Sequence, residues 1–96
     1  MQTTEQIEKK LKLIKPFLEE KFSVARIGYF GSYADKVQNE HSDLDILVEF
    51  SRPIGWNFFA LEQFLEEQFG IKIDLVTSQA IKAQLKEIIF QQVRFV

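Results

Sequence analysis

The chain has 96 residues, of which 46% are hydrophobic and ten are phenylalanine, and its net charge is −2. This composition excludes a disordered chain, and the absence of a basic excess argues against direct binding of nucleic acid. There is no cysteine, so disulfide bonds and thiolate metal sites are excluded, and we expect the protein to act in the cytoplasm.

Length favours a single domain over residues 1–96, which buries roughly 60–65% of the surface of the unfolded chain. The first ten residues, MQTTEQIEKK, lack the apolar stretch of a signal peptide. No apolar run approaches the ~20 residues of a membrane span, so we expect no membrane association.

Residues 3–22 predict the first helix. Thr3 and Gln6 have the spacing of a capping box, and apolar residues follow at helical intervals from Ile7 onward. Pro16 cannot donate a backbone hydrogen bond, so we expect it to kink the helix or to split it near Lys15.

Apolar runs at residues 24–30 and 43–50 predict the first two strands. Between them we expect a short helix over residues 33–36 and a loop over residues 37–42. This loop contains His41, the only histidine, which is expected to be exposed to solvent rather than catalytic.

The second half of the chain predicts a helix at 57–69 that ends at Gly70, a strand at 71–76, and a last helix at 79–92 capped by Ser78. The side of the last helix that we expect to be buried is formed by Ile81, Leu85, Ile88 and Ile89.

The alternation of helices and strands predicts an α/β (α+β) fold, a small mixed sheet with helices packed on it. Residues 93–96, VRFV, form an apolar tail for which the sequence suggests no partner inside so small a domain.

The strongest chemical signal is the pair Asp43 and Asp45 at the head of the second strand. Residues two apart in a strand share a face, so the two carboxylates repel unless a cation lies between them. This arrangement suits Mg²⁺, which binds one or two carboxylates together with substrate phosphates. The alternative is a turn or surface pair. A calcium loop is excluded because Leu47 and Val48 stand where that loop needs a ligand and a glycine, and no P-loop motif is present.

Gly31 and Ser32 directly follow the first strand. A glycine there allows the backbone to approach a ligand closely, and free N–H groups at the start of a following helix would bind phosphate. The Ser32 hydroxyl offers a further hydrogen bond.

Asp74 lies inside the apolar strand IKIDLV, on the same face as Lys72 and Val76. If this strand neighbours the one that carries Asp43 and Asp45, three acids come together, which is tolerable around a metal. The alternative is an ion pair between Asp74 and Lys72 or another lysine.

Gly31-Ser32, ten intervening residues, and Asp43-x-Asp45 together resemble the signature of the DNA polymerase β-type nucleotidyltransferase superfamily. The small size resembles its minimal nucleotidyltransferase (MNT) family. The resemblance implies that Asp43, Asp45 and Asp74 bind two Mg²⁺ ions and that Gly31 and Ser32 bind the phosphates of ATP. Asp74 matches the acid that also activates the attacking hydroxyl.

The sequence departs from the family at one place. MNT sequences often continue Gly-Ser-x-Ala-Arg-Gly, whereas here Asp35 and Lys36 stand in place of the arginine and glycine. An acid beside the triphosphate opposes nucleotide binding, and we expect Lys36 to take over the role of the arginine.

The resemblance also implies a partner. MNT proteins typically act as antitoxins that add AMP to a tyrosine of a HEPN-domain toxin encoded alongside, and this chain has no second domain to bind an acceptor; a second copy could also supply that surface. Two alternatives remain open. One is a module with weak catalysis that neutralises its partner by contact, and the other is a nucleotidyltransferase for a small molecule such as an antibiotic.

Overall fold

The computed structural model describes residues 2–38 and 42–96, so the expectation for His41 lies outside the described residues. Its elements, in chain order, are α1 (Thr4–Phe22), β1 (Val24–Phe30), β2 (Leu44–Phe50), α2 (Asn57–Phe69), β3 (Ile73–Thr77), the 3₁₀ helix η1 (Ser78–Ala80), α3 (Ala83–Gln92) and β4 (Arg94–Phe95). Within the described ranges, no helix has the length and apolar character that crossing a membrane requires.

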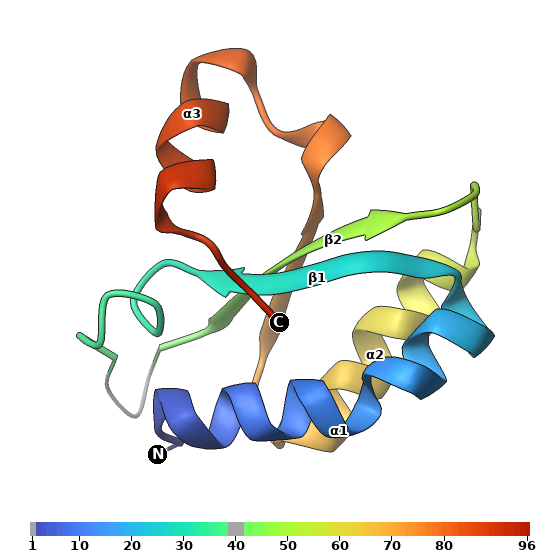
Figure 1. Cartoon of the computed structure of the whole chain (residues 1–96), viewed down its shortest axis with the longest axis horizontal. Coiled ribbons are helices and arrows are strands. Elements are labelled where there is room, and N and C mark those ends of the chain that lie inside the picture. Colours follow the sequence, from blue (N-terminus) through green and yellow to red (C-terminus); the bar gives the residue numbers. More distant parts are fainter. Residues whose placement is uncertain (1, 39–41) are drawn as a thin grey trace.

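The strands form one mixed sheet in the order β3-β2-β1-β4. β1 runs antiparallel to both β2 and β4, whereas β2 and β3 are parallel and are joined through α2. Figure 1 shows α1 and α2 together below the sheet, with α3 on the opposite side. The predicted mixed sheet with packed helices is confirmed.

Helix α1 begins as predicted. The Thr3 side chain accepts a hydrogen bond from the Gln6 backbone N–H at 3.1 Å, and the Gln6 side chain accepts one from the Thr3 N–H at 2.9 Å. Of the two outcomes predicted for Pro16, the split is wrong, because α1 continues through this residue to Phe22, and the kink stays a prediction. Pro16 is exposed, and the apolar stripe of the helix stays on the opposite, buried side.

The core lies between the sheet and the two helices α1 and α2. Its buried side chains are Ile7, Leu11, Ile14, Leu18, Phe22, Val24, Ile27, Tyr29, Tyr33, Ala34, Leu44, Ile46, Val48, Leu61, Leu65, Phe69, Ile73 and Leu75. Alternate residues of each strand contribute to it, which leaves the other face of the sheet free for polar groups.

The segment between β1 and β2 differs from the prediction. Residues 31–36 form hydrogen-bonded turns and no helix, because the left-handed conformation of Lys36 (φ 58°) ends the helical course. The Asp35 N–H donates to the Gly31 carbonyl (3.1 Å), and the Val37 N–H donates to the Ser32 carbonyl (2.9 Å). Strand β2 begins one residue later than predicted and β3 two residues later.

The last helix also differs from the prediction. Thr77 caps η1 by accepting a hydrogen bond from the Ala80 N–H (3.3 Å), and α3 starts only at Ala83, so Ser78 does not cap it. None of the residues of α3 is buried: Leu85 and Ile88 are 47% and 53% exposed. The expected buried stripe is therefore wrong, because α3 stands off the sheet face rather than packing into the core.

The apolar tail has a partner inside the domain, contrary to expectation. Residues Arg94 and Phe95 form β4 and pair with Tyr29 and Gly28 of β1. The Val96 N–H donates to the Ile27 carbonyl at 2.9 Å. A Cβ at Gly28 would come within 2.6 Å of the Arg94 carbonyl oxygen, so glycine is what allows the two strands to approach.

Candidate active site

The turn after β1 is built around Gly31, whose φ of 73° favours glycine. A side chain there would also collide with the Asp45 carboxylate, because a Cβ atom would overlap Asp45 Oδ2. Tyr33 and Ala34 are buried in the core and fix the turn from below. The sequence placed Gly31 beside a phosphate, but it did not reveal this contact with a carboxylate.

Asp45 and Asp74 are paired in register across the parallel strands β2 and β3. Residues paired in this way point to the same face, and here the face is the one opposite the core. Asp45 is partly buried whereas Asp74 is exposed. The structure therefore brings together two of the three acids by strand pairing, as the sequence predicted from alternation in each strand.

The two carboxylates are coupled electrostatically. The pKa of Asp45 is raised to about 6, chiefly by burial. It is raised further by the charge of Asp74, by a hydrogen bond with Asp74 and by the charge of Asp43. Protonated Asp45 can donate a hydrogen bond to Asp74. At neutral pH the pair carries excess negative charge, and a bound cation would relieve it.

Asp43 lies just before β2 and is exposed. Within residues 2–38 and 42–96, no three acidic, histidine or cysteine side chains are grouped so that they could hold a metal ion by themselves. Asp45 and Asp74, with Asp43 close enough to affect the pKa of Asp45, fit an ion that takes its remaining ligands from substrate phosphates and water. This is the usual binding mode of Mg²⁺.

Lys36 and Asp35 are both exposed. Lys36 Nζ lies 3.9 Å from Glu5 Oε1, a surface ion pair with the first turn of α1. The Lys36 ammonium therefore points toward α1. That Lys36 binds the triphosphate stays a prediction.

An ion pair that the sequence did not predict lies on the acid-bearing face of the sheet. Arg26 donates two hydrogen bonds to the Glu49 carboxylate, at 2.8 and 3.2 Å. These hydrogen bonds from Arg26 lower the pKa of Glu49, and further contributions come from Ser78 and Lys86. The available signal was a charged residue inside each of two apolar strands, Arg26 in the first and Glu49 in the second.

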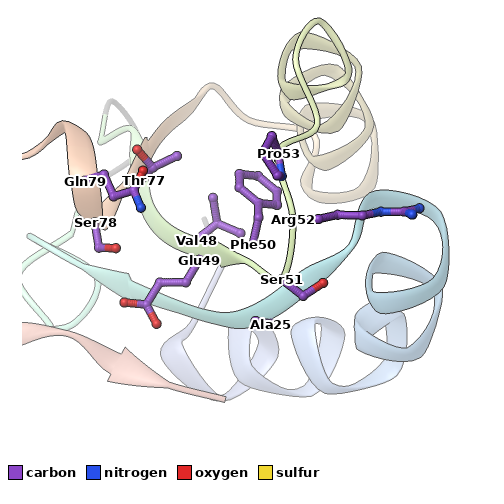
Figure 2. A pocket seen from close by; sticks show the side chains of 10 residues that line it. All are labelled: Ala25, Val48, Glu49, Phe50, Ser51, Arg52, Pro53, Thr77, Ser78 and Gln79. Atoms are coloured by element: carbon purple, nitrogen blue, oxygen red, sulfur yellow. The ribbon is translucent and has the colours of Figure 1, made fainter.

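A groove of about 520 Å³ lies at the other end of β2 and β3, away from the acids (Figure 2). It is lined by Ala25, Val48, Glu49, Phe50, Ser51, Arg52, Pro53, Thr77, Ser78 and Gln79. None of the predicted site residues borders it, so the groove and the acid pair are separate features.

Comparison with known proteins gives a consistent result. Residues 11–96 match the nucleotidyltransferase domain family. MJ0128 of Methanocaldococcus jannaschii, named as a candidate protein adenylyltransferase, is 48% identical over 83 residues, covering 85% of each chain. The protein adenylyltransferase MntA of Thermococcus cleftensis is 39% identical over 97 residues, covering 100% of this chain and 98% of MntA.

Solved structures show the same fold. A candidate minimal nucleotidyltransferase superimposes with a TM-score of 0.82 at 23% identity, covering 97% of this chain and 95% of the other. A toxin–antitoxin structure with AMP-PNP gives 0.72 at 25% identity, covering 90% and 70%. The complex of a tri-AMPylated HEPN toxin of Shewanella oneidensis with its MNT antitoxin gives 0.64 at 22% identity, covering 92% and 68%.

The motif Gly31-Ser32, the acids that follow it and these matches agree. The chain belongs to the nucleotidyltransferase domain family and is a nucleotidyltransferase of the minimal, MNT type.

Proposed function

We propose that this protein is an antitoxin of the cytoplasm that transfers AMP from Mg²⁺–ATP to a hydroxyl of a HEPN-type partner, with a tyrosine as the acceptor. The observation that carries the proposal is the pairing of Asp45 with Asp74 in register beside Gly31. The adenylyltransferase relatives support AMP as the transferred group, and the solved toxin–antitoxin complexes support a HEPN-type protein as the partner.

In the proposed reaction, the acceptor oxygen forms a bond to the α-phosphorus of ATP while the bond to the bridging oxygen breaks. Pyrophosphate leaves with the electron pair of that bond. Asp74 is exposed and lies beside partly buried Asp45, so it is the carboxylate that an acceptor hydroxyl can reach and the one that takes the proton.

Mg²⁺, held by Asp43, Asp45 and Asp74, would neutralise charge that develops on the phosphate oxygens, and two ions are expected. The chain's own residues position the substrate. The peptide groups of Gly31 and Ser32 offer close approach to the β and γ phosphates. Asp45 lies against the Gly31 Cα, so the phosphate-binding turn and the carboxylates form one surface.

Co-expression with a HEPN-type partner, followed by intact-mass measurement, tests the proposal. We expect the partner to gain one or more AMP masses, and Asp45→Asn to abolish the gain. Asp74→Asn should lower kcat far more than nucleotide affinity, because an acid that accepts the proton acts mainly in the transition state. Near-normal turnover of Asp74→Asn would contradict the role of Asp74.

One observation favours a second candidate, neutralisation by contact without efficient transfer. Asp35 replaces the family's arginine, and Lys36, which would have to bind the triphosphate in its place, is paired with Glu5. A stable complex whose partner gains no mass, with ATP present, would support this candidate. Transfer to a small molecule in the absence of any partner would overturn both.

A further inference from the structure

Helix α3 has no buried residue, yet a compact cluster fastens it and β4 to the sheet. The centre of the cluster is Arg26 of β1. Its guanidinium carbon lies 3.8 Å from the ring centroid of Phe95 in β4 and 6.0 Å from that of Phe90 in α3. The two rings also contact each other, with centroids 6.2 Å apart.

Arg26 is held in turn by Glu49 of β2 through two hydrogen bonds. The Ser78 hydroxyl of η1 and the charge of Lys86 in α3 also help to lower the pKa of the Glu49 carboxylate. The cluster therefore joins the end of α3 and β4 to the two central strands. Its Arg26 and Glu49 side chains are 46% and 29% exposed, so the contacts are accessible to solvent and are weaker than core packing.

Strand register places this cluster beside the acids. Gly28 pairs with both Leu47 and Phe95, so Phe95 shares the acid-bearing face with Leu47. Leu47 is fully buried although it lies outside the core cluster, which means that atoms above this face cover it. Asp45 lies two residues before Leu47 on the same strand.

The distance between the two features is short. Two strand spacings and two residues along a strand separate the Cα positions of Phe95 and Asp45, about 12 Å in a flat sheet. An extended nucleoside triphosphate is at least that long. β4 and the end of α3 therefore lie within reach of a nucleotide that binds at Asp45 and Asp74 on this face.

We propose that Arg26 is a positioning residue, which holds α3 and β4 in place as one wall of the nucleotide site through its stacking on Phe95 and Phe90 and its ion pair with Glu49. This inference rests on the proposed function for the nucleotide and adds a residue outside the acidic and glycine motifs. Loosening the wall lowers the fraction of molecules that are ready to bind, which weakens apparent affinity by the same factor.

Arg26→Ala tests the structural part. Backbone amides of residues 83–92 should exchange with solvent several-fold faster in the nucleotide-free protein, as followed by NMR, while core amides of α1 stay unchanged. Arg52→Ala is the matched control: Arg52 donates a hydrogen bond to Ser23 Oγ at 2.8 Å and points away from η1 (Figure 2). Equal α3 exchange in both variants would overturn the proposal.

Nucleotide binding and transfer test the functional part. Arg26→Ala should raise the Kd and KM for Mg²⁺–ATP about fivefold to tenfold and change kcat less than twofold. Arg26→Lys keeps the charge but loses the planar stacking, so about a threefold rise is expected. A fall in kcat with unchanged KM, or faster α3 exchange with unchanged Kd, would overturn the role as a wall.

The outcomes also separate this inference from the proposed function. Amide exchange and the Kd for Mg²⁺–ATP need no transfer. If wild type binds ATP but modifies no partner, while Arg26→Ala loosens α3 and weakens ATP binding, the proposed transfer fails and the positioning role stands.

Discussion

The two faces of the sheet have opposite characters, although the same strands supply both. One face is covered by α1 and α2, and its side chains, such as Ile27, Leu44 and Ile46, are inaccessible to solvent. The other face carries Asp45 and Asp74 in register, together with an exposed ion pair beneath an unburied helix. Because strand residues alternate between faces, the buried apolar side chains that stabilise the fold lie on one face and the charged side chains lie on the other.

The largest expected effect compares the same substitution on helices of the two faces. Leu65→Ala in α2 should lower the free energy of unfolding by about 2–5 kcal/mol, because it opens a cavity in a fully buried site. Leu85→Ala in α3 should cost less than about 1 kcal/mol, since that side chain is 47% exposed. Urea unfolding measures both. Similar losses would show that α3 packs as tightly as α2.

The charged face should make stability depend on pH. The folded pKa of Asp45, about 6, exceeds the ordinary 3.8, so folding takes up a proton between these values. The stabilisation from Asp45 is full below pH 4 and is lost as pH rises through 6. Because Asp45 is only partly buried, solvent screening keeps the loss below about 3 kcal/mol.

Asp45→Asn isolates this contribution, because the substitution removes the titrating carboxylate and nearly keeps the shape of the side chain. The difference in unfolding free energy, variant minus wild type, should grow in favour of the variant between pH 4 and 7. Mg²⁺ at neutral pH should reduce this difference. A difference that does not vary with pH would contradict the coupling of Asp45 with Asp74.

Two glycines with positive φ sharpen the comparison further. Gly31 and Gly70 have φ of 73° and 67°, so an alanine costs about 1–2 kcal/mol of backbone strain at either. Only Gly31 faces a neighbour, the Asp45 carboxylate, whereas nothing lies within 4 Å of a Cβ at Gly70. Gly31→Ala should cost about 1 kcal/mol more and should also abolish transfer. Equal stability and retained activity would contradict the contact.

The smallest effect concerns the departure from the family motif. Asp35→Arg should tighten Mg²⁺–ATP binding about fivefold, roughly 1 kcal/mol, because a screened negative charge becomes positive near the triphosphate. Glu67→Arg, at an exposed position of α2, makes the same change in net charge elsewhere and serves as the control. If calorimetry gives the same Kd for both variants, Asp35 lies away from the nucleotide.

The sequence predicted the features that depend on local residue patterns, namely the positions of helices and strands and the face to which each strand residue points. The spacing of apolar residues gave the exact bounds of α2 and β1, and alternation put Asp45 and Asp74 on one face. The unpredicted features depend on residues far apart in sequence. Phe95 finds Gly28 only through sheet assembly, and its stacking on Arg26 follows from that pairing.

Helix α3 shows why a pattern can mislead. Leu85 and Ile88 have helical spacing, and the sequence correctly places a helix there. Periodicity cannot tell whether a packing surface exists for the apolar side. In this fold α1 and α2 already occupy the apolar face of the sheet, so α3 lies above the charged face. Leu85 and Ile88 are therefore about half exposed.

The parallel pairing of β2 with β3 has a consequence for how the molecule folds. Asp45 and Asp74 are 29 positions apart, and they meet only when α2 has formed and carried β3 back alongside β2. Like-charge repulsion therefore acts on this longer-range closure and not on the more local pairing of β1 with β2. The same closure brings Ile46, Leu75 and Leu65 into the apolar core, and their burial offsets the repulsion between the two carboxylates.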